Sequence, residues 1–201
     1  SSGILEVLGF EQIDDPKDYK SEYKFLEKVL SEADVFVVNT CSVRQKSEDK
    51  VYGLGKLLAK IEKSHGRKPA VILTGCVTGS VTGERTRYDR KELENRTKWV
   101  DIYLPSSEVS SLPQVLSKKF PKLSKGLVSA AAGANPNHGV GDSTAYINIS
   151  YGCDNFCTYC VVPYARGKEV SRSEKDIIKD VEFALSKGKT HIMLCGQNVN
   201  S

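Results

Sequence analysis

Hydrophobic positions in the first half of the chain follow two different spacings. Residues 20–31 and 47–63 carry apolar side chains three or four positions apart, which predicts two amphipathic helices. Residues 34–39, 70–74 and 101–105 are short apolar runs, typical of buried parallel strands. Helices and strands that alternate in this way predict a small α/β domain with a parallel sheet.

The pattern changes in the second half of the chain. Residues 129–144 are rich in Gly, Ala, Asn and Pro and show no periodicity, which favours a linker. A strand is expected over 145–150, with Ile147 and Ile149 on one face. A helix over 174–187 and a strand over 191–195 follow. This is one β–α–β unit, of the kind that builds (β/α) barrels with active sites at the carboxyl ends of the strands.

These elements divide the chain into an N-terminal domain, a linker and the start of a second domain. The expected boundaries are 1–124, 125–144 and 145–201. Because one β–α–β unit cannot close a barrel or cover both faces of its sheet, we expect the chain to be part of a longer protein.

Composition is ordinary for a soluble protein, with 39% apolar and 27% charged residues among 201. No run of eighteen apolar residues and no secretory signal is visible, so a cytoplasmic protein without a membrane span is expected. The net charge of +4 does not by itself imply nucleic acid. Residues 85–98 hold six Arg or Lys against three Asp or Glu. They favour a solvated helical face over a phosphate-facing patch.

The cysteines carry the strongest chemical signal. Three of the six, Cys153, Cys157 and Cys160, fall within eight residues, where they are poorly placed to bridge one another but well placed to converge on a metal. Cys41 and Cys76 each follow a predicted strand, so they can face the same point at one sheet edge. A pair of small buried thiols explains their spacing equally well.

The C-x3-C-x2-C spacing of the loop predicts a particular kind of iron site. Three thiolates can hold three irons of a [4Fe–4S] cube and leave the fourth iron open for a chelating ligand. That is what the methionine end of S-adenosylmethionine requires for reductive cleavage of its carbon–sulfur bond. A structural zinc site or a ferredoxin is less well matched, because each normally uses four protein ligands.

Three segments resemble the radical S-adenosylmethionine (SAM) methylthiotransferase family. Residues 151–173, YGCDNFCTYCVVPYARGKEVSRS, resemble its radical loop, and residues 39–51 and 73–77 resemble its N-terminal cluster-binding domain. The segment 194–201, LCGQNVNS, is similar to the tRNA-acting MiaB subgroup. The resemblance implies a flavodoxin-like parallel-sheet domain followed by the first part of a radical SAM (β/α) partial barrel.

The same resemblance implies a reaction and its cofactors. MiaB-like enzymes methylthiolate N6-isopentenyladenosine at position 37 of tRNA, using two [4Fe–4S] clusters and S-adenosylmethionine. The radical cluster would sit on the loop cysteines. The auxiliary cluster would sit on Cys41, Cys76 and one earlier cysteine. Tyr159, Gly196 and Gln197 match segments that contact S-adenosylmethionine. Implied partners are the tRNA anticodon loop and an electron donor such as flavodoxin or ferredoxin, with a monomer expected.

The sequence departs from the family in several ways. No cysteine precedes Cys41, residues 15–32 are longer than usual, and Cys195 replaces the usual aliphatic residue and is expected to be a buried thiol. The rest of the barrel and the C-terminal RNA-binding domain are not in the sequence. The alternatives are a ribosomal-protein aspartate methylthiotransferase and a non-catalytic module with cysteine-ligated zinc or iron–sulfur.

Overall fold

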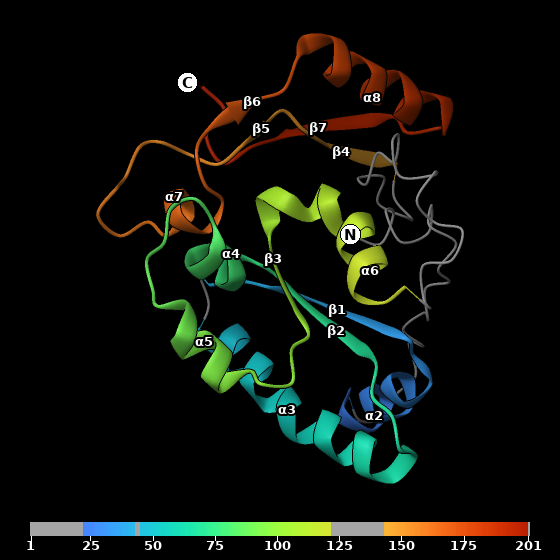
Figure 1. The fold of residues 1–201 in the computed structure, drawn as a ribbon. Coiled ribbons are helices and arrows are strands. Elements are labelled where there is room, and N and C mark those ends of the chain that lie inside the picture. The colour runs from blue at the N-terminus through green and yellow to red at the C-terminus, as the bar shows by residue number, and fades with distance from the viewer. Residues whose placement is uncertain (1–21, 43–44, 122–142, 201) are drawn as a thin grey trace.

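A three-stranded parallel sheet forms the centre of the N-terminal domain (Figure 1). The computed structural model describes residues 22–42, 45–121 and 143–200. The strands β1 (Val35–Thr40), β2 (Ala70–Gly75) and β3 (Ile102–Pro105) lie in the order β1-β2-β3. The predicted α/β class with a parallel sheet is confirmed, and each strand begins and ends within one residue of its predicted position.

Helices cover both faces of this sheet. On one face, α2 (Glu22–Glu32) and α3 (Gln45–His65) pack against Val71 of β2. On the other, α6 (Leu112–Lys119) packs against Ile72, the next residue of the same strand. Successive strand residues point to opposite faces, so a central strand covered on both sides must be apolar throughout. All six residues of β2 are indeed buried.

Two further helices follow the carboxyl end of the central strand β2. The short helix α4 (Cys76–Thr82) begins directly after β2, and α5 (Arg90–Arg96) follows it (Figure 1). A 3-10 turn, η1 (Ser106–Ser111), connects β3 to α6. The basic stretch is helical only over α5, where Leu93 is the one buried residue. The expectation of a solvated helical face therefore holds for that part of the stretch.

The second half of the described chain contains the predicted β–α–β unit. Strand β4 (Thr144–Asn148) pairs in parallel with β7 (His191–Cys195), and α8 (Glu174–Ser186) packs on β4. Ser173 caps α8, since its hydroxyl accepts a hydrogen bond from the Asp176 amide at 3.2 Å. Helix and strand therefore match the prediction to within one residue.

The predicted strand over 145–150 is wrong as a single element. The ladder with β7 ends at Asn148, and a two-residue strand β5 (Ser150–Tyr151) then pairs antiparallel with β6 (Val170–Ser171). Ile149 lies at the change of partner, where its amide donates to the Cys195 carbonyl and its carbonyl accepts from the Arg172 amide. Its side chain is therefore only half-buried, whereas Ile147 is in the core.

Other predictions fall mostly on residues that are not described. The predicted linker over 125–144 lies outside the described residues up to position 142, and the long segment 15–32 is described only from residue 22. Within the described ranges, no helix has the length and apolar character needed to cross a membrane.

Candidate functional site

The cysteine loop is an excursion whose two ends are held together. Residues 152–169 leave β5 and return to β6, its antiparallel partner. At the base of the loop, the Cys153 amide donates to the Gly167 carbonyl at 3.2 Å. Gly152 has φ of 72°, and a Cβ there would lie 2.2 Å from the Lys168 carbonyl oxygen. Only glycine therefore allows the two ends of the loop to approach so closely.

The three loop cysteines differ in their exposure. Cys153 is 7% exposed, Cys160 is half-buried and Cys157 is exposed. The Cys160 amide donates to the Cys157 carbonyl at 2.9 Å, which closes a turn between them. Phe156, directly before Cys157, has φ of 47°, a left-handed conformation that is costly for an aromatic residue. The backbone at the second cysteine is thus held in a strained conformation.

The segment after β7 contacts the start of the loop. The side-chain oxygen of Gln197 accepts a hydrogen bond from the Gly152 amide at 2.9 Å. The Asn198 carbonyl accepts from the Ser150 hydroxyl at 2.8 Å, and Gly196 packs so closely on Ser150 that a Cβ would lie 2.3 Å from its oxygen. Two of the predicted cofactor-binding residues therefore lie beside the cysteine loop. The third, Tyr159, is 87% exposed.

Cys41 and Cys76 follow neighbouring strands, as predicted. The pair Thr40 and Gly75 is the last of the β1–β2 ladder, so the two cysteines come next on adjacent strands. Thr40 ties the strand ends together, because its hydroxyl donates to the Thr74 carbonyl at 2.6 Å and accepts from the Val77 amide at 3.1 Å. Cys41 is half-buried and Cys76 is buried. No earlier cysteine exists in the sequence to join them.

Polar atoms without partners surround this edge of the sheet. Among the described residues, the hydroxyls of Ser42, Thr74 and Thr78 are buried with no hydrogen-bond partner. Each belongs to a residue within two positions of Cys41 or Cys76. Buried hydroxyls are normally paired, so the three near Cys41 and Cys76 have hydrogen-bonding capacity that the described residues leave unused.

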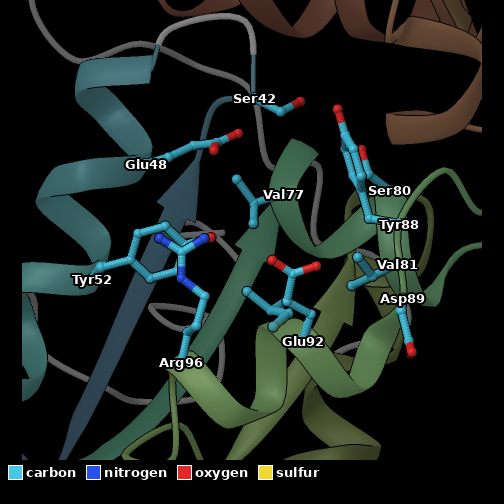
Figure 2. Close-up of a pocket in the computed structure, with 11 residues that line it drawn as sticks. Ser42, Glu48, Tyr52, Val77, Ser80, Val81, Tyr88, Asp89, Glu92 and Arg96 are labelled. Atoms are coloured by element: carbon cyan, nitrogen blue, oxygen red, sulfur yellow. The ribbon is translucent and has the colours of Figure 1, made fainter.

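An open cavity of about 320 Å³ adjoins the same edge (Figure 2). Ser42 and Val77, which follow the two cysteines, line it from the sheet side. Across the cavity, the Arg96 guanidinium stacks on the Tyr52 ring at 3.5 Å. Burial raises the pKa of Glu48 above its ordinary value, although the positive charge of Arg96 acts in the opposite direction. The volume is in the range of small-molecule sites.

The Cys195 thiol is not buried, contrary to the prediction. It is half-exposed at the end of β7 and is placed to donate weakly to the Met193 carbonyl. Met193 and Leu194 are also about half exposed. Among the described strands β7 has β4 as its single neighbour, so its side chains are less covered than those of a central strand.

Sequence reasoning missed the contacts between the basic stretch and the cysteine loop. Arg85 forms an ion pair with Asp154 at 2.7 Å, and Arg87 lies over the Tyr164 ring at 5.8 Å. The hydrogen bond from Arg85, followed by one from the Glu169 amide, holds the pKa of Asp154 below its ordinary value. Arg90 pairs with Glu94 in the same helix. Because these arginines have partners within the chain, the phosphate-facing interpretation loses support.

The described residues supply suitable donors but not a preformed metal site. No three Cys, His, Asp or Glu side chains in the described ranges lie close enough together to hold a metal ion. The three loop cysteines are free thiols on one loop, which is the donor chemistry of an iron–sulfur site. The unpaired hydroxyls beside Cys41 and Cys76 suit an added group there, although only two thiols are present. The donors fit, and binding would have to bring the loop thiols together.

Family comparisons agree with this architecture. Residues 19–104 match the uncharacterized protein family UPF0004, and residues 147–201 match the radical SAM superfamily. The chain thus combines a UPF0004 domain with the start of a radical SAM domain, a class that uses S-adenosylmethionine and a [4Fe–4S] cluster.

Curated relatives with similarity along the whole chain share one name. The whole chain is 33% identical to "tRNA-2-methylthio-N(6)-dimethylallyladenosine synthase" of Staphylococcus haemolyticus and 34% identical to the protein of that name from Bacillus licheniformis, covering 36% of each. It is 35% identical to the Dictyoglomus thermophilum protein, covering 41%. The predicted resemblance to MiaB-like methylthiotransferases is confirmed, and the chain spans well under half the length of these relatives.

Proposed function

We propose that this chain acts in the methylthiolation of N6-isopentenyladenosine at position 37 of tRNA by radical SAM chemistry. The observation that carries the proposal is the C-x3-C-x2-C loop at the carboxyl end of the first strand of a radical SAM match. Relatives named as tRNA methylthio-adenosine synthases align along the entire chain, and this supports the substrate.

In this proposal each cysteine group has a role. Cys153, Cys157 and Cys160 would hold the radical cluster, which supplies reductive cleavage of S-adenosylmethionine when bound. Gly196 and Gln197 would line the cofactor site, because both lie against the start of the loop. Tyr159 is free to cover the adenine, since its side chain projects into solvent. Cys41 and Cys76 would contribute two ligands to an auxiliary cluster.

Anaerobic reconstitution with ferrous iron and sulfide tests the radical site. We expect visible iron–sulfur absorbance and about four irons per chain on the loop. Changing the three loop cysteines together to alanine should remove these four irons and their absorbance, leaving at most the absorbance of a cluster on Cys41 and Cys76. Cys195→Ala, which changes a half-exposed thiol outside the loop, should leave the loop cluster intact. Retention of zinc with no iron–sulfur absorbance would instead support the non-catalytic module.

A second experiment tests the substrate. Nucleoside analysis of tRNA from a strain that lacks the full-length gene should show loss of the 2-methylthio mark, and the full-length gene should restore it. Normal tRNA together with loss of a modified aspartate in a ribosomal protein would support the ribosomal-protein alternative. Extracts of the restored strain allow flavodoxin and ferredoxin to be compared as electron donors.

The remaining partner assignments belong to the same proposal. A tRNA anticodon loop is the partner that the reaction requires, and an external reductant must supply the electron. We propose a monomer as the working unit, which sedimentation of the full-length protein would check.

A further inference from the structure

A single arginine of the N-terminal domain contacts two residues of the cysteine loop. Arg85 Nη1 lies 2.7 Å from Asp154 Oδ1, and its guanidinium carbon lies 4.8 Å from the centre of the Phe156 ring. Asp154 and Phe156 both lie between the first two loop cysteines. The segment from Cys153 to Cys157 is therefore held at two points by one side chain from the other domain.

The loop supports these contacts from its own side. The carboxylate oxygen of Asp154 that pairs with Arg85 also accepts a hydrogen bond from the Glu169 amide at 3.3 Å. The Phe156 ring meets the Tyr164 ring edge-on with centres 6.0 Å apart. Asp154 thereby connects the beginning and the end of the loop. Arg85, which comes from the N-terminal domain, binds the same carboxylate oxygen.

Stability of the fold is a weak explanation for this arrangement. The side chains of Arg85 and Asp154 are 25% and 42% exposed, and ion pairs as exposed as this contribute little to global stability. Phe156 is 48% exposed and holds a strained backbone conformation, which a packing role alone would not require. The contacts instead restrict the conformation of the residues next to two cysteines.

We propose that Arg85 is a positioning residue through which the UPF0004 domain sets the geometry of the radical SAM cysteine loop. The proposal rests on the proposed function, in that the loop is the iron site. Arg85 fixes Asp154, next to Cys153, and Phe156, next to Cys157, and so limits how the two thiols are presented.

The test uses the metal-free chain and the buried thiol of Cys153. This thiol can be alkylated by iodoacetamide only when the loop opens, so its labelling rate, followed by mass spectrometry, reports the open population. Arg85→Ala should raise that rate about three- to tenfold, the range expected for losing an exposed ion pair and a cation–π contact. Arg85→Lys keeps the charge but not the planar group, and should give a smaller increase.

Matched variants separate positioning from a general effect on folding. Arg90→Gln removes an arginine of the same stretch, whose ion pair with Glu94 is exposed, and should leave Cys153 labelling unchanged. Asp154→Asn, a change of similar shape, should raise the labelling rate, and adding it to Arg85→Ala should give less than the product of the two effects. If Arg85→Ala does not fold, the Asp154→Asn variant alone still tests the proposal.

After reconstitution, the Arg85→Ala protein should keep its iron but show an altered electron paramagnetic resonance spectrum when reduced. Labelling at the wild-type rate in both Arg85→Ala and Asp154→Asn would overturn the proposal, as would an equal increase in Arg90→Gln. Failure of every variant and of the wild type to bind iron would contradict the proposed function while leaving the labelling result readable.

Discussion

Substitution of Gly79 by alanine is the sharpest test of how the two domains pack. Gly79 lies in α4, which packs against α7 (Val162–Ala165), the short helix of the cysteine loop that follows its three cysteines. A Cβ at this position would lie 2.0 Å from the Ala165 carbonyl oxygen and 2.9 Å from its carbonyl carbon. The obstacle is backbone, so no rotation of a side chain can relieve it.

The size of the effect follows from that distance. Ordinary contact begins at 3.4 Å, so the two helices must separate by at least 1.4 Å (3.4 minus 2.0). Overpacking of this kind costs about 1–3 kcal/mol, while alanine regains about 1 kcal/mol of helix propensity over glycine. Because backbone must move, we expect the upper end, a net loss of about 1–2 kcal/mol. For a chain of this length that lowers Tm by about 2–8 °C.

The assay is urea unfolding followed by the fluorescence of Trp99, the only tryptophan in the sequence. Gly53→Ala in α3 is the matched control, because a Cβ at Gly53 meets no atom within 4 Å. This variant should gain about 0.5–1 kcal/mol from propensity alone. If Gly79→Ala is stabilised to the same extent as Gly53→Ala, α4 and α7 do not approach as closely as the structure shows, and the reasoning fails.

Three further changes have defined outcomes. Thr40→Val leaves the Val77 amide without an acceptor and should cost about 1–3 kcal/mol in urea unfolding, whereas Thr40→Ser should cost less than half as much. Arg172→Ala removes the 2.7 Å ion pair with the buried carboxylate of Asp180 and should cost about 1.5–3 kcal/mol in urea unfolding; an unchanged midpoint would contradict this. Burial raises the pKa of Glu48 in the folded state, so the native state binds this proton more tightly than the unfolded state does. The free energy of unfolding therefore falls as pH rises from about 4.5 through the raised pKa. Glu48→Gln should lack this decline, and its advantage over wild type should therefore grow with pH in thermal melts.

Elements whose local sequence agrees with their tertiary role could be predicted. Residues 70–74, AVILT, are apolar at every position, and a central strand with helices on both faces needs that composition. The apolar spacing between 47 and 63 likewise predicted α3, which extends two residues further at each end. The positions of Cys41 and Cys76 followed from the strands, because residues after adjacent parallel strands share an edge.

Helix α4 could not be predicted because its sequence opposes its conformation. The segment CVTGSVT contains β-branched residues, serine and glycine, all poor helix formers. Its first six residues are buried between β3 and α7, so tertiary packing overrides the local preference. The end of β4 was missed for a similar reason, since the change of partner at Ile149 depends on Arg172, which lies 23 positions away in the sequence.

The Arg85–Asp154 contact was invisible for a different reason. The two residues are 69 positions apart, and each is an unremarkable charge in its own segment. The basic stretch was therefore interpreted as a solvated surface, although the cysteines of the loop had been recognised. Composition shows that charged side chains are present. Whether each one faces solvent or pairs with a residue far away in the sequence depends on the fold.

One helix connects the two groups of cysteines. Cys76 is the first residue of α4, Gly79 of the same helix touches Ala165, and α7 begins two residues after Cys160. The path from one cysteine group to the other thus runs through a seven-residue helix and a backbone-to-backbone contact, with no flexible side chain between them. Packed interiors transmit displacement because they contain little free volume. We therefore expect a change that moves α4 relative to β2 to shift both cysteine groups. The close approach of the Ala165 backbone also explains why this poor helical sequence requires glycine at its contact with α7.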